Sequence, residues 1–213
     1  MARIVVVDLG MGNLRSVERA LLQSATNENI ACEVIRSNRP EEILSADKIV
    51  VPGQGAFRDC AAALETGLGD VLREVIRSGK PYLGICLGMQ VLFESSEEAE
   101  GALGLGVLQG HVKKLEPGCG AEGVKIPHIG WNQLEMTAWP GVFRVFREEA
   151  PFMYFVHSYH VVPDDPSLIV AIVRHGPNQV TAAIRRDNIT AVQFHPEKSQ
   201  GPGLALLGAF VVE

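Results

Sequence analysis

The sequence is poor in the features that mark disulfide-stabilised, metal-binding or membrane-spanning proteins. Its 213 residues include only four cysteines, which are widely spaced and form no Cys-x-x-Cys pair. That spacing argues against a zinc site or a redox motif. No apolar run approaches the roughly 20 residues that a membrane-spanning helix needs, and Asp8 interrupts the first run too early for a signal peptide. We therefore expect free thiols and a cytoplasmic location.

The sequence also lacks a strong charge of either sign. Lysine and arginine number 19 against 25 aspartate and glutamate residues, which gives a net charge of -6. A modest negative charge argues against a general affinity for nucleic acid or for an anionic membrane surface. The composition, 46% hydrophobic and 21% charged, is that of an ordinary globular protein. A chain of this length can bury a substantial core, and we expect a single domain over residues 1–213.

The first half of the chain alternates between short β-branched runs and segments with apolar residues at helical spacing. The expected strands are Arg3–Asp8, Ala31–Ile35, Asp47–Val51 and Pro81–Ile85, and the expected helices are Leu14–Ser24, Phe57–Leu64, Gly69–Ser78 and Leu87–Glu94. This alternation predicts parallel strands joined by right-handed crossovers, with helices on both faces of the sheet.

The second half of the chain is richer in strand-like runs. The expected strands are Val107–Leu115, Phe152–Val156, Leu168–Val173, Thr181–Arg185 and Thr190–Phe194, followed by an apolar helix over Gly203–Val211. We expect these strands to extend the sheet in antiparallel fashion. The predicted fold class is α/β, a three-layer, doubly wound, mixed but mainly parallel sheet with an antiparallel extension.

One cysteine lies between two glycines where an expected strand meets an expected helix. The segment Gly84–Gly88 reads Gly-Ile-Cys-Leu-Gly, the pattern of a nucleophile elbow with cysteine in place of serine. Glycine on either side relieves the crowding of a sharp strand-to-helix turn. Such a turn holds Cys86 at the carboxyl end of the sheet, with the N–H of Leu87 toward a substrate oxygen. The alternative is a buried cysteine packed between two glycines.

A histidine and a glutamate two residues apart end the last expected strand. His195 and Glu197 face the same side of an extended chain. The imidazole can take the thiol proton, while the carboxylate holds the ring in one orientation and tautomer. Taken alone, this pair is matched equally well by a loop histidine beside an unrelated acid. Together with the elbow it is far more specific, and it predicts a triad of Cys86, His195 and Glu197.

The third expected strand ends in the glycine-rich turn Gly53-Gln54-Gly55. An oxyanion hole needs a second backbone donor besides the one after the nucleophile. A glycine-rich turn can present free N–H groups close to a substrate carbonyl. The alternative is an ordinary turn that ends the strand, which is the usual role of a Pro-Gly sequence.

With these three elements in view, the chain resembles the class I (triad) glutamine amidotransferases. Within this class it is similar, nearly end to end, to the glutaminase subunits of imidazole glycerol phosphate synthase, a family of histidine biosynthesis. The elbow and the closing segment around His195 mark the superfamily. The segments that point to the subunit family are Asp8–Ser16, Pro127–Asn132 and Tyr154–Tyr159.

The resemblance implies a role for individual residues and no metal or organic cofactor. Cys86 would be the nucleophile, His195 the base and Glu197 the residue that orients it. The resemblance further implies an oxyanion site at Gly53, Gln54, Gly55 and Leu87 and a site for the amino-acid end of glutamine at Gln90, His157, Ser158 and Tyr159. The family often has valine where this chain has Gln54, which leaves open the peptide that donates to the oxyanion.

The resemblance also implies a partner, a separate (β/α)8-barrel cyclase bound as a heterodimer. A barrel needs about 250 residues by itself, so this chain would be the ammonia source only. The ammonia would cross the interface and serve the synthesis of imidazole glycerol phosphate and AICAR. Asn13, Trp131 and Lys198 fall in segments that line this interface. The alternatives are a core or surface aromatic for Trp131 and a solvated charge for Lys198.

Three other functions remain open at this point. Glutaminase subunits of anthranilate or pyridoxal phosphate synthesis share the triad but differ in the opening segment and around Trp131. A dinucleotide-binding protein would have Gly10 and Gly12 after its first strand, but Arg15 stands where the third glycine belongs. An interaction module without enzymatic activity would use Trp131 and Ile129 as an apolar docking patch, and an intact triad argues against it.

Overall fold

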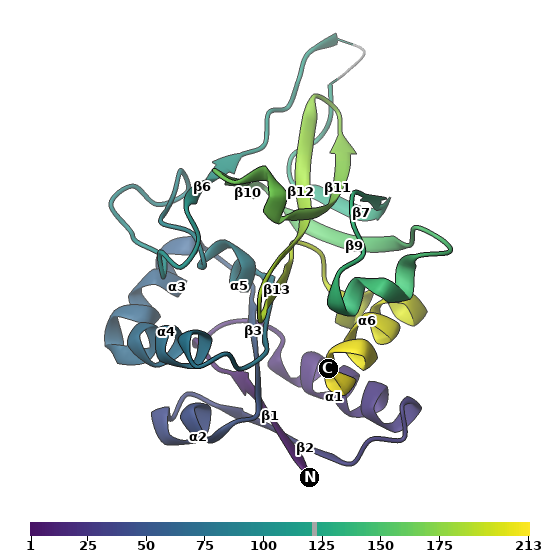
Figure 1. Ribbon diagram of the computed structural model, residues 1–213. Coiled ribbons are helices and arrows are strands. Elements are labelled where there is room, and N and C mark those ends of the chain that lie inside the picture. The colour runs from purple at the N-terminus through teal and green to yellow at the C-terminus, as the bar shows by residue number, and fades with distance from the viewer. Residues whose placement is uncertain (121–122) are drawn as a thin grey trace.

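A computed structural model describes residues 1–120 and 123–213 (Figure 1). Its centre is an eight-stranded sheet in the order β2-β1-β3-β4-β13-β12-β11-β8. The strands are β1 (Ala2–Val7), β2 (Cys32–Ser37), β3 (Lys48–Gly53), β4 (Tyr82–Cys86), β8 (Glu135–Met136), β11 (Ile169–His175), β12 (Asn178–Arg186) and β13 (Ile189–Val192). All four strands expected in the first half lie in this sheet.

The parallel part of the sheet brings three strand ends together. β1 pairs in parallel with β2 and β3, β3 pairs with β4, and β4 pairs with β13. Every residue of β3, β4 and β13 is buried, as expected for strands covered on both faces. In this register Gly53 lies opposite Cys86, and Val192 lies opposite Ile85. The carboxyl ends of β3, β4 and β13 therefore meet at one edge of the sheet.

Helices cover both faces of the sheet (Figure 1). On one face lie α1 (Leu14–Asn27) and α6 (Gln200–Val212), and on the other α2 (Pro40–Ser45), α3 (Phe57–Ala63), the π-helical turn η1 (Leu64–Leu68) and α4 (Gly69–Arg77). The side chains of β1 alternate between two buried clusters: Ile4 and Val6 pack with α1 and α6, whereas Val5 and Val7 pack with the other helices. This arrangement confirms the predicted three-layer, doubly wound fold. Within the described ranges, no helix combines the length and apolarity that crossing a membrane requires.

The antiparallel extension is confirmed for part of the second half. β12 runs antiparallel to both β13 and β11, and β8 runs antiparallel to β11. Short 3-10 helices connect the second-half elements: η3 (Gly141–Phe146), η4 (Pro166–Leu168) and η5 (Pro196–Lys198). η5 follows the end of β13 and leads into α6, so it places the segment after His195 against that helix.

Two of the expected strands do not extend the central sheet, and this part of the prediction was wrong. The run Val107–Leu115 contributes β6 (Gly110–Lys114) to a separate sheet with β10 (Tyr159–Pro163) and β5 (Ser95–Ser96). The run Phe152–Val156 contributes β9 (Phe152–His157), which pairs with β7 (His128–Gln133). Both runs found partners in segments that apolar spacing alone did not identify as strands, because such pairing is decided by tertiary contacts.

The helix expected over Leu87–Glu94 is also shorter than predicted. α5 covers only Leu87–Gln90. The carbonyl oxygens of Val91 and Leu92 accept hydrogen bonds of 2.6–3.0 Å from the backbone of the loop 105–108. Long-range pairing has therefore replaced the helical turns that local spacing predicted.

Candidate active site

The elbow at the end of β4 holds Cys86 in a strained conformation. Cys86 is the last residue of β4 and the N-cap of α5, with φ 55° and ψ -109°. A positive φ is uncommon for a residue with a side chain, and such strain costs about 1–3 kcal/mol. Leu87 is the first residue of α5, so its N–H has no acceptor within the helix. The elbow thus places a sulfur and a free backbone donor side by side.

Close backbone contacts explain the glycines around Cys86. A Cβ on Gly88 would overlap the carbonyl oxygen of Val51 in β3, and one on Gly84 would overlap the carbonyl oxygen of Gly88. A Cβ on Gly53 would lie only 2.6 Å from the Cβ of Leu87. The turn is therefore pressed between β3 and β4, and only glycine allows this approach.

His195 and Glu197 reach the same edge of the sheet from the end of β13. The backbone N–H of His195 donates to the carbonyl oxygen of Tyr154 (2.9 Å), which ties the segment to β9. His195 Nδ1 lies 2.9 Å from Glu197 Oε1, and the two side chains are only 2% and 1% exposed. The two groups meet as expected, although Glu197 lies in the 3-10 helix η5 and not in the extended chain that the sequence argument assumed. This bond orients the imidazole and leaves its Nε2 atom for another partner.

The ionisation of His195 depends on its two neighbours. Burial lowers the pKa of His195, but its interactions with Cys86 and Glu197 outweigh the burial and raise the pKa to about 9. His195 Nε2 and Glu197 Oε2 are buried, and neither has a hydrogen-bond partner within the described residues. A buried unpaired polar atom is costly unless it serves a function. The raised pKa means that the imidazole of His195, bonded to Glu197, can carry a proton at neutral pH.

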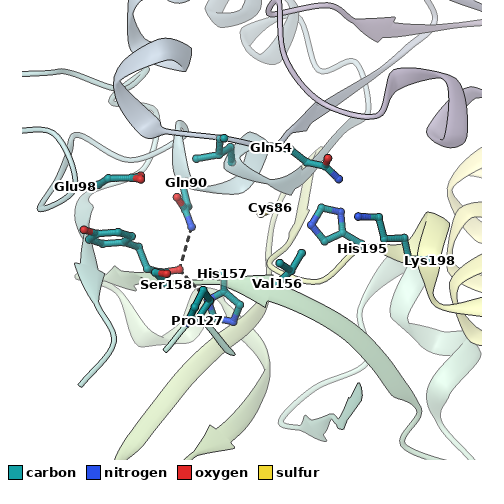
Figure 2. Close-up of a pocket in the computed structure, with 13 residues that line it drawn as sticks. Gln54, Cys86, Gln90, Glu98, Pro127, Val156, His157, Ser158, His195 and Lys198 are labelled. Carbon is teal, nitrogen blue, oxygen red and sulfur yellow. Dashed lines mark hydrogen bonds between the residues drawn. The ribbon is translucent and has the colours of Figure 1, made fainter. Parts of the chain in front are cut away.

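A cavity of about 320 Å³ opens beside the elbow (Figure 2). Its lining residues come from segments far apart in the sequence. They are Gln54, Gly55, Cys86, Leu87, Gln90, Glu98, Pro127, Val156, His157, Ser158, Tyr159, His195 and Lys198. Every residue expected in the triad, the oxyanion site and the glutamine site lines this cavity, except Glu197, which lies behind His195, and Gly53, which lies behind the elbow. Within the described residues, no three histidine, cysteine, aspartate or glutamate side chains group to hold a metal ion.

The oxyanion segment lies against the elbow at the end of β3. Gly53 is paired with Cys86 in the sheet, and Gln54 and Gly55 turn into the cavity. Gly55 has φ 112°, a conformation that favours glycine. The backbone of Gly53 and Gln54 also contacts Gly12 from the opening loop, because a Cβ on Gly12 would lie 3.6 Å from Gln54 N. The opening segment therefore supports the oxyanion turn from behind.

The residues expected to bind glutamine share one backbone carbonyl. Gln90 Nε2 donates to the carbonyl oxygen of Tyr159 (3.1 Å), and His157 Nδ1 lies 2.9 Å from the same oxygen. His157 Nε2 lies 3.0 Å from His128 Nδ1. Burial lowers the pKa of His157 to about 3 and the pKa of His128 to about 4, so both rings are neutral at pH 7. This network fixes the turn at Ser158 that borders the cavity.

Sequence reasoning missed two polar side chains of the site. Glu98 lines the cavity, and its Oε2 accepts a hydrogen bond from the N–H of Phe57 (2.9 Å). It lies in the acidic, polar stretch Ser95–Glu100, whose composition is typical of a solvated helix end or loop, and nothing in the sequence distinguishes it from its neighbours. Gln193 donates to Cys86 Sγ (3.5 Å). The two-residue spacing of Gln193 from His195 was the available signal, because residues two apart in an extended chain would face the same side.

Of the three residues expected at the partner interface, Lys198 lines the cavity, whereas Trp131 and Asn13 do not. Trp131 is 45% exposed, and its ring lies 6.0 Å from the ring of Tyr154. Lys198 Nζ lies 5.8 Å from the centre of the same ring and also lines the cavity. Asn13 is exposed and caps α1 by accepting from the N–H of Ser16 (3.3 Å). An exposed aromatic and a cation thus stand beside the triad.

The family model of class I glutamine amidotransferases matches residues 5–213. The chain is 47% identical to the imidazole glycerol phosphate synthase subunit HisH of Cyanothece sp., over 99% of this chain and 96% of the relative. It is 46% identical to the subunit of the same name from Geobacter sulfurreducens, over 99% and 98%. The chain belongs to the HisH family of class I glutamine amidotransferases. This membership selects among the glutaminase subunits that the sequence had left open.

Solved structures share the fold of this HisH-family chain. A crystal structure of a glutamine amidotransferase superposes with a TM-score of 0.67 at 20% identity, covering 94% of each chain. A glutamine amidotransferase from Thermotoga maritima superposes with a TM-score of 0.60 at 17% identity, covering 92% of this chain and 76% of the other. At these identities the likeness supports the fold class alone.

An NMR titration of the His195 ring tests the ionisation of this pair. We expect a midpoint at about pH 9, above the ordinary 6.5. Glu197→Gln removes an opposite charge and should lower the midpoint by about one unit or more. His157, with its pKa of about 3, should stay neutral in the same spectra and serves as the internal control.

The same titration has a consequence for stability. Because the folded-state pKa of His195 is raised, its protonation stabilises the fold fully below pH 6.5, and this contribution is lost as pH rises toward 9. A wild-type midpoint near 6.5, or one that Glu197→Gln leaves unchanged, would contradict the arrangement.

Proposed function

We propose that this chain is the glutaminase subunit of an imidazole glycerol phosphate synthase and supplies ammonia to a cyclase partner in histidine biosynthesis. The support is similarity along 99% of the chain to proteins named as that subunit, together with a cavity lined by Cys86 and by His195, whose ring is bonded to Glu197 behind it. We further propose that residues 1–213 act as one domain, to be tested by a single cooperative unfolding transition.

The location that fits this function is the cytoplasm. All four cysteines are free, and Cys119 is exposed. Exposed free thiols persist in a reducing compartment and are oxidised elsewhere. Cell fractionation of a producing strain tests this location, and recovery of the protein outside the cytoplasmic fraction would contradict it.

In the proposed reaction, Cys86 attacks the side-chain carbonyl of glutamine. The thiolate forms a bond to the carbonyl carbon, and the carbonyl oxygen becomes an oxyanion next to the N–H of Leu87 and the Gly53–Gly55 turn. The protonated His195 gives its proton to the amide nitrogen, so that ammonia leaves and a γ-glutamyl thioester remains. His195 then takes a proton from water, which attacks the thioester and releases glutamate. Glu197 holds the imidazole throughout.

The polarity of the cavity orients glutamine for this reaction. Cys86 and His195 lie at one end, whereas Glu98 and Ser158 lie toward the other (Figure 2). Among the described residues, Glu98 is the one carboxylate of the lining, and it suits the positively charged α-amino group of an amino acid. The side-chain amide then reaches the sulfur. Gln90 and the turn from His157 to Tyr159 border the same end and are proposed to hold the α-carboxylate and α-amino groups.

A cysteine substitution tests the nucleophile. Cys86→Ser should lower glutamine-dependent turnover by several orders of magnitude, because the hydroxyl is a far weaker nucleophile. The complex with the cyclase should still work with added ammonium salt, since the partner carries that chemistry. Cys119→Ser, which changes an exposed cysteine away from the cavity, should keep full activity. Full glutaminase activity in Cys86→Ser would rule the scheme out.

A charge substitution tests the proposed pairing with the α-amino group. Glu98→Gln should raise the KM for glutamine by about ten- to a hundredfold, the value of one charge-assisted hydrogen bond. The matched control is Glu97→Gln, because Glu97 is exposed and accepts from Lys114 N (2.8 Å) outside the cavity. Steady-state kinetics of the complex would show both effects. Equal KM values for the two variants would contradict the role of Glu98.

A tryptophan substitution tests the proposed interface with the cyclase. Trp131→Ala should weaken the complex by about thirtyfold, as the loss of a buried aromatic anchor does. Trp139→Ala removes another partly exposed tryptophan (38% exposed) and should leave affinity unchanged. Isothermal titration calorimetry with the cyclase measures the dissociation constants of both variants. Indistinguishable affinities for the two variants would move the interface away from Trp131.

A further inference from the structure

A fourth side chain reaches the sulfur of Cys86. Gln193 follows β13, where Val192 lies opposite Ile85 of β4, so the next residue of each strand brings Gln193 beside Cys86. Its Nε2 lies 3.5 Å from Cys86 Sγ, and the residue is 0% exposed. A fully buried amide is costly unless its polar atoms have partners. The position of Gln193 is therefore set by the sheet, and its side-chain amide needs hydrogen-bond partners within the protein interior.

The orientation of this amide follows from one backbone carbonyl. The carbonyl oxygen of Tyr159 can only accept, so the atom of Gln90 that faces it (3.1 Å) must be the NH2 group. The same NH2 group lies 3.1 Å from Gln193 on its other side and meets the Oε1 atom. The NH2 group of Gln193 is thereby turned toward Cys86. The hydrogen-bond partners therefore determine which terminal atom of each side-chain amide is nitrogen and which is oxygen.

Two neutral histidines belong to the same series of hydrogen bonds as the Tyr159 carbonyl. A neutral imidazole carries one ring proton, and His157 uses the proton on Nδ1 to donate to the Tyr159 carbonyl oxygen (2.9 Å). His157 Nε2 must then accept from His128 Nδ1 (3.0 Å). The donors and acceptors therefore follow in one consistent order from His128 to the sulfur. A reversed Gln193 amide would set its oxygen against the sulfur and its NH2 against that of Gln90.

The chemistry of the sulfur gives this hydrogen bond a function. An N–H donates more strongly to a thiolate than to a neutral thiol, because a hydrogen bond to a charged acceptor is about twice as strong as a neutral one. Gln193 does not line the cavity, so substrate does not displace it. Among the described residues, the ionisable groups that interact with the sulfur are His195, with Glu197 behind it, and Cys60 on α3.

We propose that Gln193 is a catalytic residue whose side-chain amide donates a hydrogen bond to the Cys86 thiolate and stabilises it for attack on glutamine. This proposal rests on the proposed role of Cys86 as nucleophile. It gives Gln90 a second task, the orientation of the Gln193 amide. The consequence is a thiolate held by His195 and by Gln193, two residues that both follow β13.

The pH dependence of Cys86 alkylation tests the proposal directly. The probe is iodoacetamide, and peptide mass spectrometry reads the label on Cys86 alone. Gln193→Met removes the donor without adding charge, and it should move the alkylation profile to higher pH by about one to two units. At pH 7 the rate should fall at least about tenfold, and at high pH it should recover, since the thiolate then forms without help.

A second variant and a control separate this role from a structural one. Gln193→Glu keeps an oxygen for Gln90 but puts a second oxygen against the sulfur, so it should shift the profile at least as far. Thr190→Val changes another fully buried polar residue, in the strand β13 that Gln193 follows; Thr190 accepts a hydrogen bond from Arg185 (2.6 Å). This variant should leave the profile unchanged. A folded Gln193→Met whose profile superimposes on that of the wild type would overturn the proposal.

The unsubstituted protein provides a further measurement. The side-chain amide proton of Gln193 should shift in an NMR titration over the pH range in which Cys86 alkylation rises, and Cys86→Ser should abolish this shift. An amide proton that is indifferent to both would equally overturn the proposal. In the complex with the cyclase, Gln193→Met should lower kcat more than it raises the KM for glutamine. These readouts do not depend on Cys86→Ser losing glutaminase activity, so failure here is distinguishable from failure of the proposed function.

Discussion

The parallel pairing of β4 with β13 is the interaction on which the site depends. The two strands are joined through four residue pairs, from Ile189 with Tyr82 to Val192 with Ile85. Parallel strands end at the same edge of a sheet, so the residues that follow, Cys86 and the Gln193–Glu197 segment, emerge together. The pairing closes a chain segment of more than a hundred residues, and the full burial of both strands offsets that loop-closure cost.

Close packing around β4 turns this proximity into a defined geometry. The positive φ of Cys86 would relax if the elbow were loosely held. The backbone of β3 presses on the elbow at Gly88 and Gly53, where no side chain fits. The strain is thereby maintained by contacts made elsewhere, and the sulfur stays at the cavity wall without reorganisation. Such preorganisation is what an electrostatic site needs in order to stabilise a developing charge.

Buried polar groups around the cavity follow one rule. The chain from His128 through the Tyr159 carbonyl to Gln90 and Gln193 pairs each donor with an acceptor. The exception lies at the reacting pair, where His195 Nε2 and Glu197 Oε2 have no partner within the described part of the chain. His160 Nδ1 and Arg3 Nε are the other buried side-chain atoms of the described residues without a partner, and both lie outside the cavity lining. At the cavity, the unmet hydrogen-bonding capacity therefore lies on His195 and Glu197.

The sequence by itself determined the alternation of strands and helices, the elbow at Cys86 and the place of His195 after the last parallel strand, because these depend on neighbours in the chain. Sequence motifs also sufficed for the family. Tertiary structure alone decided the pairing of β7 with β9 and of β6 with β10, the early end of α5 and the arrival of Glu98 and Gln193 at the site. Each of these depends on contacts between distant segments, for which local periodicity carries no information.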